Sequence, residues 1–289
     1  MGARLWLRDT IHMNDSLAPW LHDLRAVEVE LLLARYRSSI VDKRLLEIGS
    51  GTGFQLRELR KHCRQCIGVD LQSSVALTSR VADVLVYDGR NLPFRDASFD
   101  VVYSSNVLEH VDDLFDLLSE CRRVLRPGGR AIHVVPSHWW KIWTLLTHWP
   151  AGSMRALQRF GAFAHHTRSV ARSGPSSCTD SVTRAFNFAN FAFPPRHGER
   201  GNRITEFYYF HPAWWRREFS EAGWRILDET PIRILYSGNS FFRGSIPIST
   251  RRHLARYFGS ASSAFMMEWG AGEAPVAERA TDRNRDNLA

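Results

Sequence analysis

A glycine-rich turn between an apolar strand and a helix is the stretch of this sequence best suited to bind a ligand. It reads Leu45-Leu-Glu-Ile-Gly-Ser-Gly-Thr-Gly-Phe54, and a helix is expected from Phe54. Glycine lets the backbone turn tightly and approach a ligand closely, and the helix start presents free N–H groups. The spacing E-x-G-x-G-x-G differs from the G-x-G-x-x-G that hosts a pyrophosphate. Glu47 would repel a pyrophosphate but suits a cationic amino-acid ligand.

Two further acids follow apolar strands along the chain. Asp70 comes about twenty residues after the first glycine, the position at which a carboxylate can accept both ribose hydroxyl hydrogens. Asp88, followed by Gly89, closes the next strand and could bond an adenine amino group. Plain turn or capping roles are the alternative for both aspartates. Acids at three successive strand ends predict a nucleoside site, because ligands of open α/β sheets bind outside the carboxyl ends of the strands.

These residues must be positioned by apolar strands that alternate with amphipathic helices. Continuous apolar strands separated by helices are typical of a parallel sheet covered on both faces. We expect an α/β fold with a Rossmann-like, mostly parallel seven-stranded sheet, helices on both faces and an inserted helical or loop lid after the fifth strand. The strands are expected at 45–48, 66–69, 84–87, 101–104, 131–135, 224–229 and 262–269. Further helices are expected at 23–36, 111–125, 211–222 and 250–257, the second ended by Arg126-Pro-Gly-Gly129.

The sequence resembles the class I S-adenosylmethionine (SAM)-dependent methyltransferases, and among them the type 11 family, which includes quinone-biosynthesis enzymes. The resemblance implies SAM as the cofactor. It is carried by Leu46-Glu-Ile-Gly-Ser-Gly-Thr-Gly-Phe54, Gly68-Val-Asp-Leu71, Asp88-Gly-Arg-Asn-Leu-Pro-Phe94, Ser98-Phe-Asp-Val-Val-Tyr103, Asn106-Val-Leu-Glu-His-Val111 and Val124-Leu-Arg-Pro-Gly-Gly129.

The resemblance also assigns cofactor contacts to residues of the strand ends. It implies that the glycine turn surrounds the methionine part of SAM, Asp70 holds the ribose, and Asp88 with Gly89 reaches the adenine. Ser105 and Asn106 would line the cofactor near its reactive methyl. The full expected cofactor set is Glu47, Gly49, Ser50, Gly51, Asp70, Leu71, Asp88, Gly89, Ser105 and Asn106.

Changes in composition divide the chain into five parts. We expect an N-terminal helical cap over 1–40, the SAM-binding core over 41–136, a substrate-binding or lid insertion over 137–207, the rest of the core over 208–269, and a disordered tail over 270–289. No apolar run is long enough to span a membrane, and the four cysteines are too few for a disulfide framework. These features predict a cytoplasmic protein.

The acceptor of the methyl group is the least determined part of the prediction. Alignment of donor and nucleophile can suffice for methyl transfer, but a hydroxyl acceptor would benefit from a general base, most often His. The candidate catalytic residues are His110, His138 and His197, with ordinary structural hydrogen bonding as the alternative for each. No metal site is expected, because the Cys63/Cys66 pair lacks a second pair with zinc-ligand spacing. We expect a small-molecule, lipid-linked or glycan-linked acceptor, methylated at oxygen.

The insertion carries most of the positive charge of the chain. Residues 137–207 hold nine Lys and Arg against three acids, or +6 of the formal +8, with Trp139, Trp140, Trp143 and Trp149 near their start. Basic residues beside Trp suit a helix lying on an anionic membrane, whereas a helix packed on the core as a substrate lid is the slightly favoured alternative. Nucleic acid is not an expected partner, because no Asn/Asp-Pro-Pro-Tyr/Phe motif, Pro-Cys nucleophile or RNA-binding module is found.

Two other classes of protein compete with a methyltransferase. A nicotinamide-dependent oxidoreductase is opposed by the glycine spacing and by Glu47. A non-catalytic module that keeps the fold is opposed by the presence of Glu47, Gly49 and Asp70. The sequence does not predict an oligomeric state.

Overall fold

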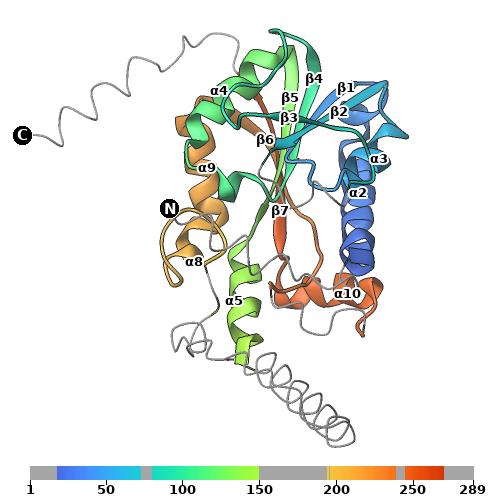
Figure 1. Ribbon diagram of the computed structural model, residues 1–289. Coiled ribbons are helices and arrows are strands. Elements are labelled where there is room, and N and C mark those ends of the chain that lie inside the picture. Colours follow the sequence, from blue (N-terminus) through green and yellow to red (C-terminus); the bar gives the residue numbers. More distant parts are fainter. Residues whose placement is uncertain (1–17, 73–79, 150–193, 195, 239–244, 270–289) are drawn as a thin grey trace, which may run out of the picture.

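A seven-stranded sheet forms the centre of the molecule (Figure 1). The computed structural model describes residues 18–72, 80–149, 194, 196–238 and 245–269. The strand order is β3-β2-β1-β4-β5-β7-β6, and only β7 runs antiparallel to its neighbours. The strands are β1 Arg44–Ile48, β2 Gln65–Leu71, β3 Val84–Tyr87, β4 Phe99–Ser105, β5 Leu125–Pro136, β6 Trp224–Pro231 and β7 Ser262–Trp269. All seven predicted strands and the predicted fold class are confirmed.

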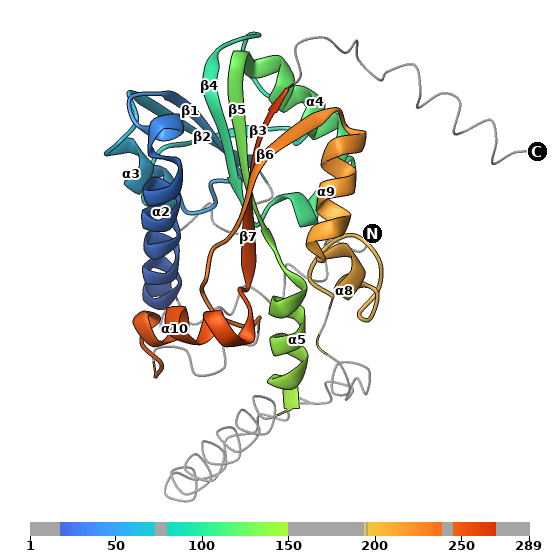
Figure 2. The same ribbon diagram turned by 180° about the vertical axis from the view of Figure 1, so that it is seen from behind.

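Helices cover both faces of the sheet (Figures 1 and 2). α2 and α3 lie on one face, and α4 and α9 lie on the other. The central strand β1 is buried from both sides: Leu45 belongs to one core cluster and Leu46 to the other. The helices are α2 Ala18–Ile40, α3 Phe54–Arg60, α4 Leu114–Val124, α5 His138–Leu146, α8 Glu206–Tyr209, α9 Pro212–Glu221 and α10 Ile248–Phe258, with a 3-10 turn η2 at Leu108–His110.

The strand order reverses between β1 and β4. The chain proceeds from β1 outward to β2 and β3, and then returns to the other side of β1 with β4. At such a switch point the loops after the two central strands diverge and leave a crevice at the carboxyl edge of the sheet. The glycine turn after β1 and the residues after β4 lie at this switch point.

Several predicted boundaries differ from the observed ones, and two of the differences have a clear structural reason. β5 begins at Leu125, not at residue 131, because Phe99 pairs with Leu125 and Val101 with Arg130, so that residues 126–129 form a bulge inside the strand. Gly128 supplies the positive φ of 75° that this bulge uses. The helix expected from residue 111 begins at Leu114, because Val111 is extended and separates η2 from α4.

The insertion after β5 is described in part. α5 follows β5 directly and buries Trp140, Lys141 and Thr144. Residues 150–193, most of the expected lid, and the tail at 270–289 lie outside the described residues, so the predicted division into domains stays a prediction. Among the helices described, none has the length and apolar character needed to cross a membrane.

Candidate active site

The turn after β1 has backbone geometry that only glycine adopts easily. Gly49, Gly51 and Gly53 have φ values of 71°, 54° and 78°. A Cβ on Gly49 would lie 2.3 Å from Val107, so this glycine lets the turn pack against the segment after β4. A Cβ on Gly51 would meet no atom of the described residues within 4 Å. The backbone at Gly51 is therefore open to a ligand.

Glu47 is buried at the end of β1. Its side chain is 2% exposed, and its Oε2 makes no hydrogen bond with the part of the chain that is described. Burial raises the pKa of Glu47 to about 7. A buried carboxylate oxygen without a donor fits a cationic ligand group, and the ammonium group of SAM is one.

Asp70, at the end of β2, holds the glycine turn in place. It accepts hydrogen bonds from Gly51 N–H at 2.9 Å and from Leu71 N–H at 2.8 Å. Ser50 is buried in the same turn and donates to the Glu47 carbonyl at 3.2 Å. A carboxylate has about four acceptor positions, so the two bonds to Asp70 leave it able to accept ribose hydroxyls.

Asp88 caps the turn that follows β3. It accepts from the backbone N–H groups of Arg90 and Asn91, both at 2.8 Å, and these bonds lower the pKa of its carboxyl group. Gly89 has a φ of 84° within this turn. The capping role expected as the alternative for Asp88 is thus present, and its contact with adenine stays a prediction.

α2 contributes two charged residues that sequence reasoning missed. Glu28 is fully buried and accepts from Arg25 at 2.5 Å and from Ser105 Oγ, at the end of β4, at 2.9 Å. Arg25 also donates to Ser105 at 3.2 Å, and Asn106 follows with a positive φ of 53°. In the sequence, Arg25 and Glu28 have the spacing of an ordinary surface pair. Their only signal was that Glu28 lies beside the apolar stripe of the helix.

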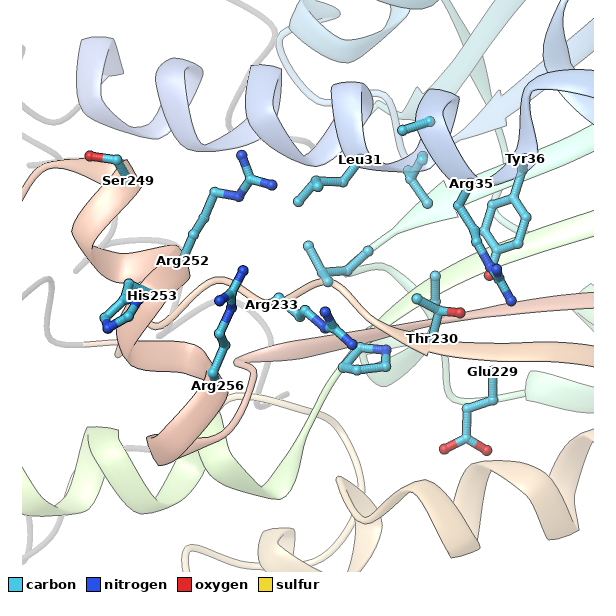
Figure 3. A pocket seen from close by; sticks show the side chains of 15 residues that line it. Leu31, Arg35, Tyr36, Glu229, Thr230, Arg233, Ser249, Arg252, His253 and Arg256 are labelled. Carbon is cyan, nitrogen blue, oxygen red and sulfur yellow. The ribbon is translucent and has the colours of Figure 1, made fainter.

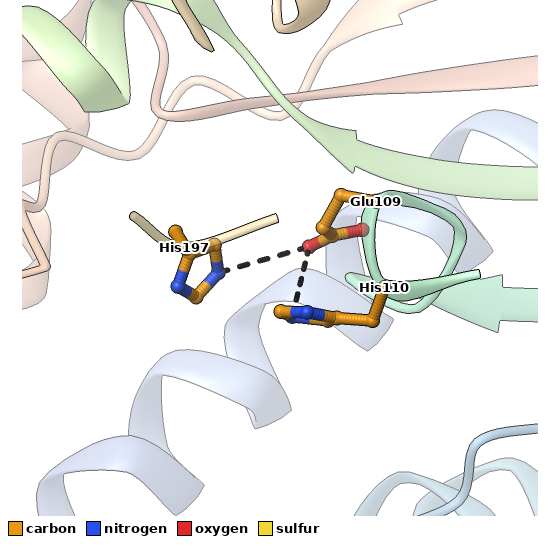
Figure 4. Close-up of side chains that lie close together, drawn as sticks. All are labelled: Glu109, His110 and His197. Carbon is orange, nitrogen blue, oxygen red and sulfur yellow. Dashed lines mark ion pairs between the residues drawn. The ribbon is translucent and has the colours of Figure 1, made fainter. Parts of the chain in front are cut away.

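Two of the three predicted histidines meet at a buried glutamate (Figure 4). The Nε2 atoms of His110 and His197 each lie 3.9 Å from Oε1 of Glu109, and the two rings are 4.8 Å apart. Burial lowers the pKa of His110 to about 4 and that of His197 to about 3, so both rings are neutral at pH 7. Burial also raises the pKa of Glu109, 2% exposed, to about 8. Glu109 belongs to the motif Asn106-Val-Leu-Glu-His-Val111, but the sequence alone did not predict a role for it.

The loop that carries His197 is fixed on η2 by buried polar contacts. Glu206 accepts from the N–H groups of His197 at 2.6 Å and Gly198 at 2.9 Å. It also forms an ion pair with Lys141 of α5, and both side chains are at most 1% exposed. Glu199 N–H donates to the Glu109 carbonyl at 2.9 Å. These contacts hold the loop of His197 beside Glu109, although the two residues are far apart in the sequence.

His138 lies apart from this cluster. Its ring stacks on that of His211, with ring centroids 4.8 Å apart. Burial lowers the pKa of His138, and the nearby His211 lowers it further by charge repulsion. It lines a hollow of about 710 Å³ together with Arg233 and Arg256. The structure therefore does not place His138 with His110 and His197.

A larger pocket of about 850 Å³ lies between α2, the end of β6 and α10 (Figure 3). Four arginines line it, namely Arg35, Arg233, Arg252 and Arg256. Arg35 is paired with Asp228 at 2.6 Å. The others give the pocket a positive lining.

The sheet order, the antiparallel seventh strand and the glycine turn at the switch point define a class I SAM-dependent methyltransferase. A family model described as a methyltransferase domain matches residues 46–133. An uncharacterized methyltransferase of Mycobacterium sp. (strain KMS) is 30% identical over 207 residues, which are 67% of this chain and 76% of that protein. The chain belongs to the SAM-dependent methyltransferase family.

Other relatives match over shorter stretches. The biotin biosynthesis bifunctional protein BioHC of Cellvibrio japonicus is 38% identical over 37% of this chain, which spans 22% of that protein. Malonyl-[acyl-carrier protein] O-methyltransferase 1 of Coxiella burnetii is 35% identical over 29% of this chain and 30% of its own length. A solved SAM-dependent methyltransferase from Aquifex aeolicus is 12% identical over 84% of this chain and 91% of its own, with a TM-score of 0.46.

Proposed function

We propose that this methyltransferase acts on an oxygen atom of a small or carrier-linked acceptor at the carboxyl edge of the sheet. The observation that carries the proposal is the position of two imidazoles, those of His110 and His197, which converge on the buried Glu109 beyond the end of β4. A neutral imidazole can accept the proton that a hydroxyl group releases as its oxygen is methylated. The relative from Coxiella burnetii is named as an O-methyltransferase, which supports oxygen as the methylated atom.

The cofactor would be held by the residues at the ends of β1 to β4. Glu47 would receive the ammonium group and Arg25 the carboxylate of the methionine part, while Gly51 gives the backbone room for a close approach. Asp70 would hold the ribose, with Ser50 and Leu71 beside it. SAM supplies an activated methyl group on a sulfonium.

The remaining chemistry falls to the protein side chains. Ser105 and Asn106 line the end of β4, where Arg25 and Glu28 fix Ser105 by hydrogen bonds. The histidine pair orients the acceptor hydroxyl and takes its proton at a ring nitrogen. Trp140 packs on His197 at 4.5 Å and helps to exclude water from this position.

The test is a methyl-transfer assay with labelled SAM and a panel of hydroxy and carboxy acceptors, free and carrier-linked. The proposal predicts that His197→Gln lowers kcat at least about 100-fold without weakening SAM binding by calorimetry. The exposed His62→Gln is the matched control and should behave as wild type. Product methylated on nitrogen or carbon would overturn the assignment to oxygen, and binding of NAD but not SAM would overturn the enzyme class.

We also propose a peripheral contact with anionic membranes through the adjoining ends of α5 and α10. The two helices meet where Trp143 packs on Phe258, with ring centroids 5.6 Å apart. Leu146 is 59% exposed at the end of α5 and Tyr257 is 72% exposed at the end of α10. Exposed apolar side chains beside the arginines of α10 suit the interface of an anionic bilayer. Lys141 takes no part, because it is buried against Glu206. Failure to co-float with anionic vesicles would remove this contact.

A further inference from the structure

The cluster formed by Glu109, His110 and His197 has the composition of a metal site. One carboxylate oxygen and one ring nitrogen from each histidine lie within 4.8 Å of one another. Figure 4 shows the three side chains converging from η2 and from the loop after residue 194. Glu109 Oε1 is equally distant, at 3.9 Å, from both Nε2 atoms.

The state of Glu109 is the second and independent observation. Its side chain is 2% exposed, and neither carboxylate oxygen makes a hydrogen bond with the described residues. Buried polar groups in folded proteins almost always have a hydrogen-bond partner, and a bound cation would satisfy both oxygens of this acid. Most other buried acids of the region are satisfied: Glu28 by Arg25 and Ser105, and Glu206 by Lys141 and two backbone N–H groups. Glu109 is aimed at two histidine nitrogens instead.

We propose that Glu109, His110 and His197 bind a divalent transition-metal ion of the Zn²⁺, Co²⁺ or Mn²⁺ type. Two imidazoles and one carboxylate are a ligand set for such ions, whereas Mg²⁺ and Ca²⁺ prefer oxygen ligands alone. Ligand atoms that bind at about 2.0–2.2 Å lie roughly 3.0–3.5 Å apart. Side-chain rotations would have to shorten the 3.9 Å from Glu109 Oε1 to each Nε2 atom, and separations of up to 4.8 Å within the set, to reach this spacing.

The surroundings of the cluster would hold its ligands in place. The peptide groups at 197 and 198 are tied to Glu206, and Glu206 is tied to Lys141. Trp140 and Phe210 pack against the His197 ring at 4.5 and 6.3 Å. Supporting contacts of this kind orient the ligands of metal sites and limit the access of solvent.

Three protein ligands leave coordination positions open for a substrate oxygen. This consequence rests on the proposed oxygen acceptor. With a metal bound, the ring nitrogens would be ligands and would no longer accept the proton, and the hydroxyl, held in a fixed orientation, would release its proton to solvent more readily. The metal site itself rests on the geometry of the three side chains alone.

The test is metal binding by the full chain after treatment with a chelator. Co²⁺ titration followed by visible absorption, and Zn²⁺ content by mass spectrometry after dialysis, are expected to give one ion per chain. Each of Glu109→Gln, His110→Gln and His197→Gln should weaken Co²⁺ binding by about 100-fold, from the removal of one ligand. His62→Gln, an exposed histidine outside the cluster, should bind as wild type.

Each outcome bears on the proposal. Sub-stoichiometric binding, or equal loss in His62→Gln and the cluster variants, would overturn it. Should Glu109→Gln fail to fold by circular dichroism, the partly exposed His110 provides the second variant, and wild-type binding by His110→Gln would overturn the assignment. SAM affinity of the metal-free protein, measured in parallel, separates the two ideas: loss of SAM binding is evidence against the enzyme, not against the metal site.

Discussion

At the scale of single residues, the burial of Glu47 links SAM binding to pH. Its pKa of about 7 means that the carboxyl group is largely protonated below neutrality, whereas an ammonium ligand requires the ionised form. We predict that SAM affinity rises between pH 6 and pH 8 as Glu47 ionises. Calorimetry should show this rise in the wild type and a flat profile in Glu47→Gln, with affinity about 10- to 100-fold lower at pH 8. A Glu47→Gln variant that keeps the pH dependence would show that another group is responsible.

The same residue makes the ligand-free protein less stable as pH rises. The pKa of Glu47 is raised from 4.5 to about 7 by burial, so the folded state retains a proton that the unfolded state has released. The stability that the folded state gains from holding this proton is fully present below pH 4.5 and is lost as pH rises to about 7. The free energy of unfolding should therefore decline between pH 4.5 and pH 7, and the decline should be smaller in Glu47→Gln by on the order of 3 kcal/mol. Thermal unfolding at several pH values measures it. Identical pH profiles would contradict the shift.

Substitutions at two glycines of the turn should affect folding and ligand binding to different extents. Gly49→Ala places a methyl group 2.3 Å from Val107 in a positive-φ position, and should lower the free energy of unfolding by about 2–4 kcal/mol. Gly51→Ala has the strained φ but no steric conflict, so about 1–2 kcal/mol is expected, with SAM affinity at least about tenfold lower. Adding Val107→Ala to Gly49→Ala should recover part of its stability. Unchanged SAM binding in Gly51→Ala would show that the ligand does not approach there.

At the scale of elements, the buried pair of Lys141 and Glu206 connects α5 and α8 to the loop of His197. Glu206→Gln leaves the Lys141 charge buried and unpaired, and should cost about 3–5 kcal/mol in unfolding free energy. Because the loop then loses its anchor, methyl transfer should fall while SAM affinity is retained. The exposed partner of Arg196, Glu199, is the control: Glu199→Gln should cost less than about 1 kcal/mol. Equal costs in the two variants would show that the buried pair has no special role.

At the scale of the whole molecule, the sheet was predictable and the convergence of its loops was not. The stretches 84–87 and 262–269 gave strands with the observed bounds. The first is rich in β-branched and aromatic residues, which favour strands even at the partly exposed edge of the sheet, and the second is buried along most of its length. Pro127 and its two following glycines misled the prediction, since a bulge inside a strand uses the same residues as a strand boundary. Glu109 and His197 are 88 positions apart, and no local pattern shows that the Lys141–Glu206 pair brings them together.

The net charge of +8 also acts at this scale, since it draws the whole molecule toward anionic surfaces. If the ends of α5 and α10 dock on a bilayer, charge alone will not explain binding, and the exposed Leu146 and Tyr257 will contribute apolar burial. We predict that the protein co-floats with phosphatidylserine vesicles but not with neutral vesicles, and that Leu146→Ser with Tyr257→Ser weakens binding about 10-fold or more. Phe115→Ser, which removes a 44% exposed ring from α4, is the matched control and should bind as wild type. Binding that disappears at high salt and is equal in all variants would mean that the contact is electrostatic and has no defined docking face, because screening removes charge attraction but leaves apolar burial intact.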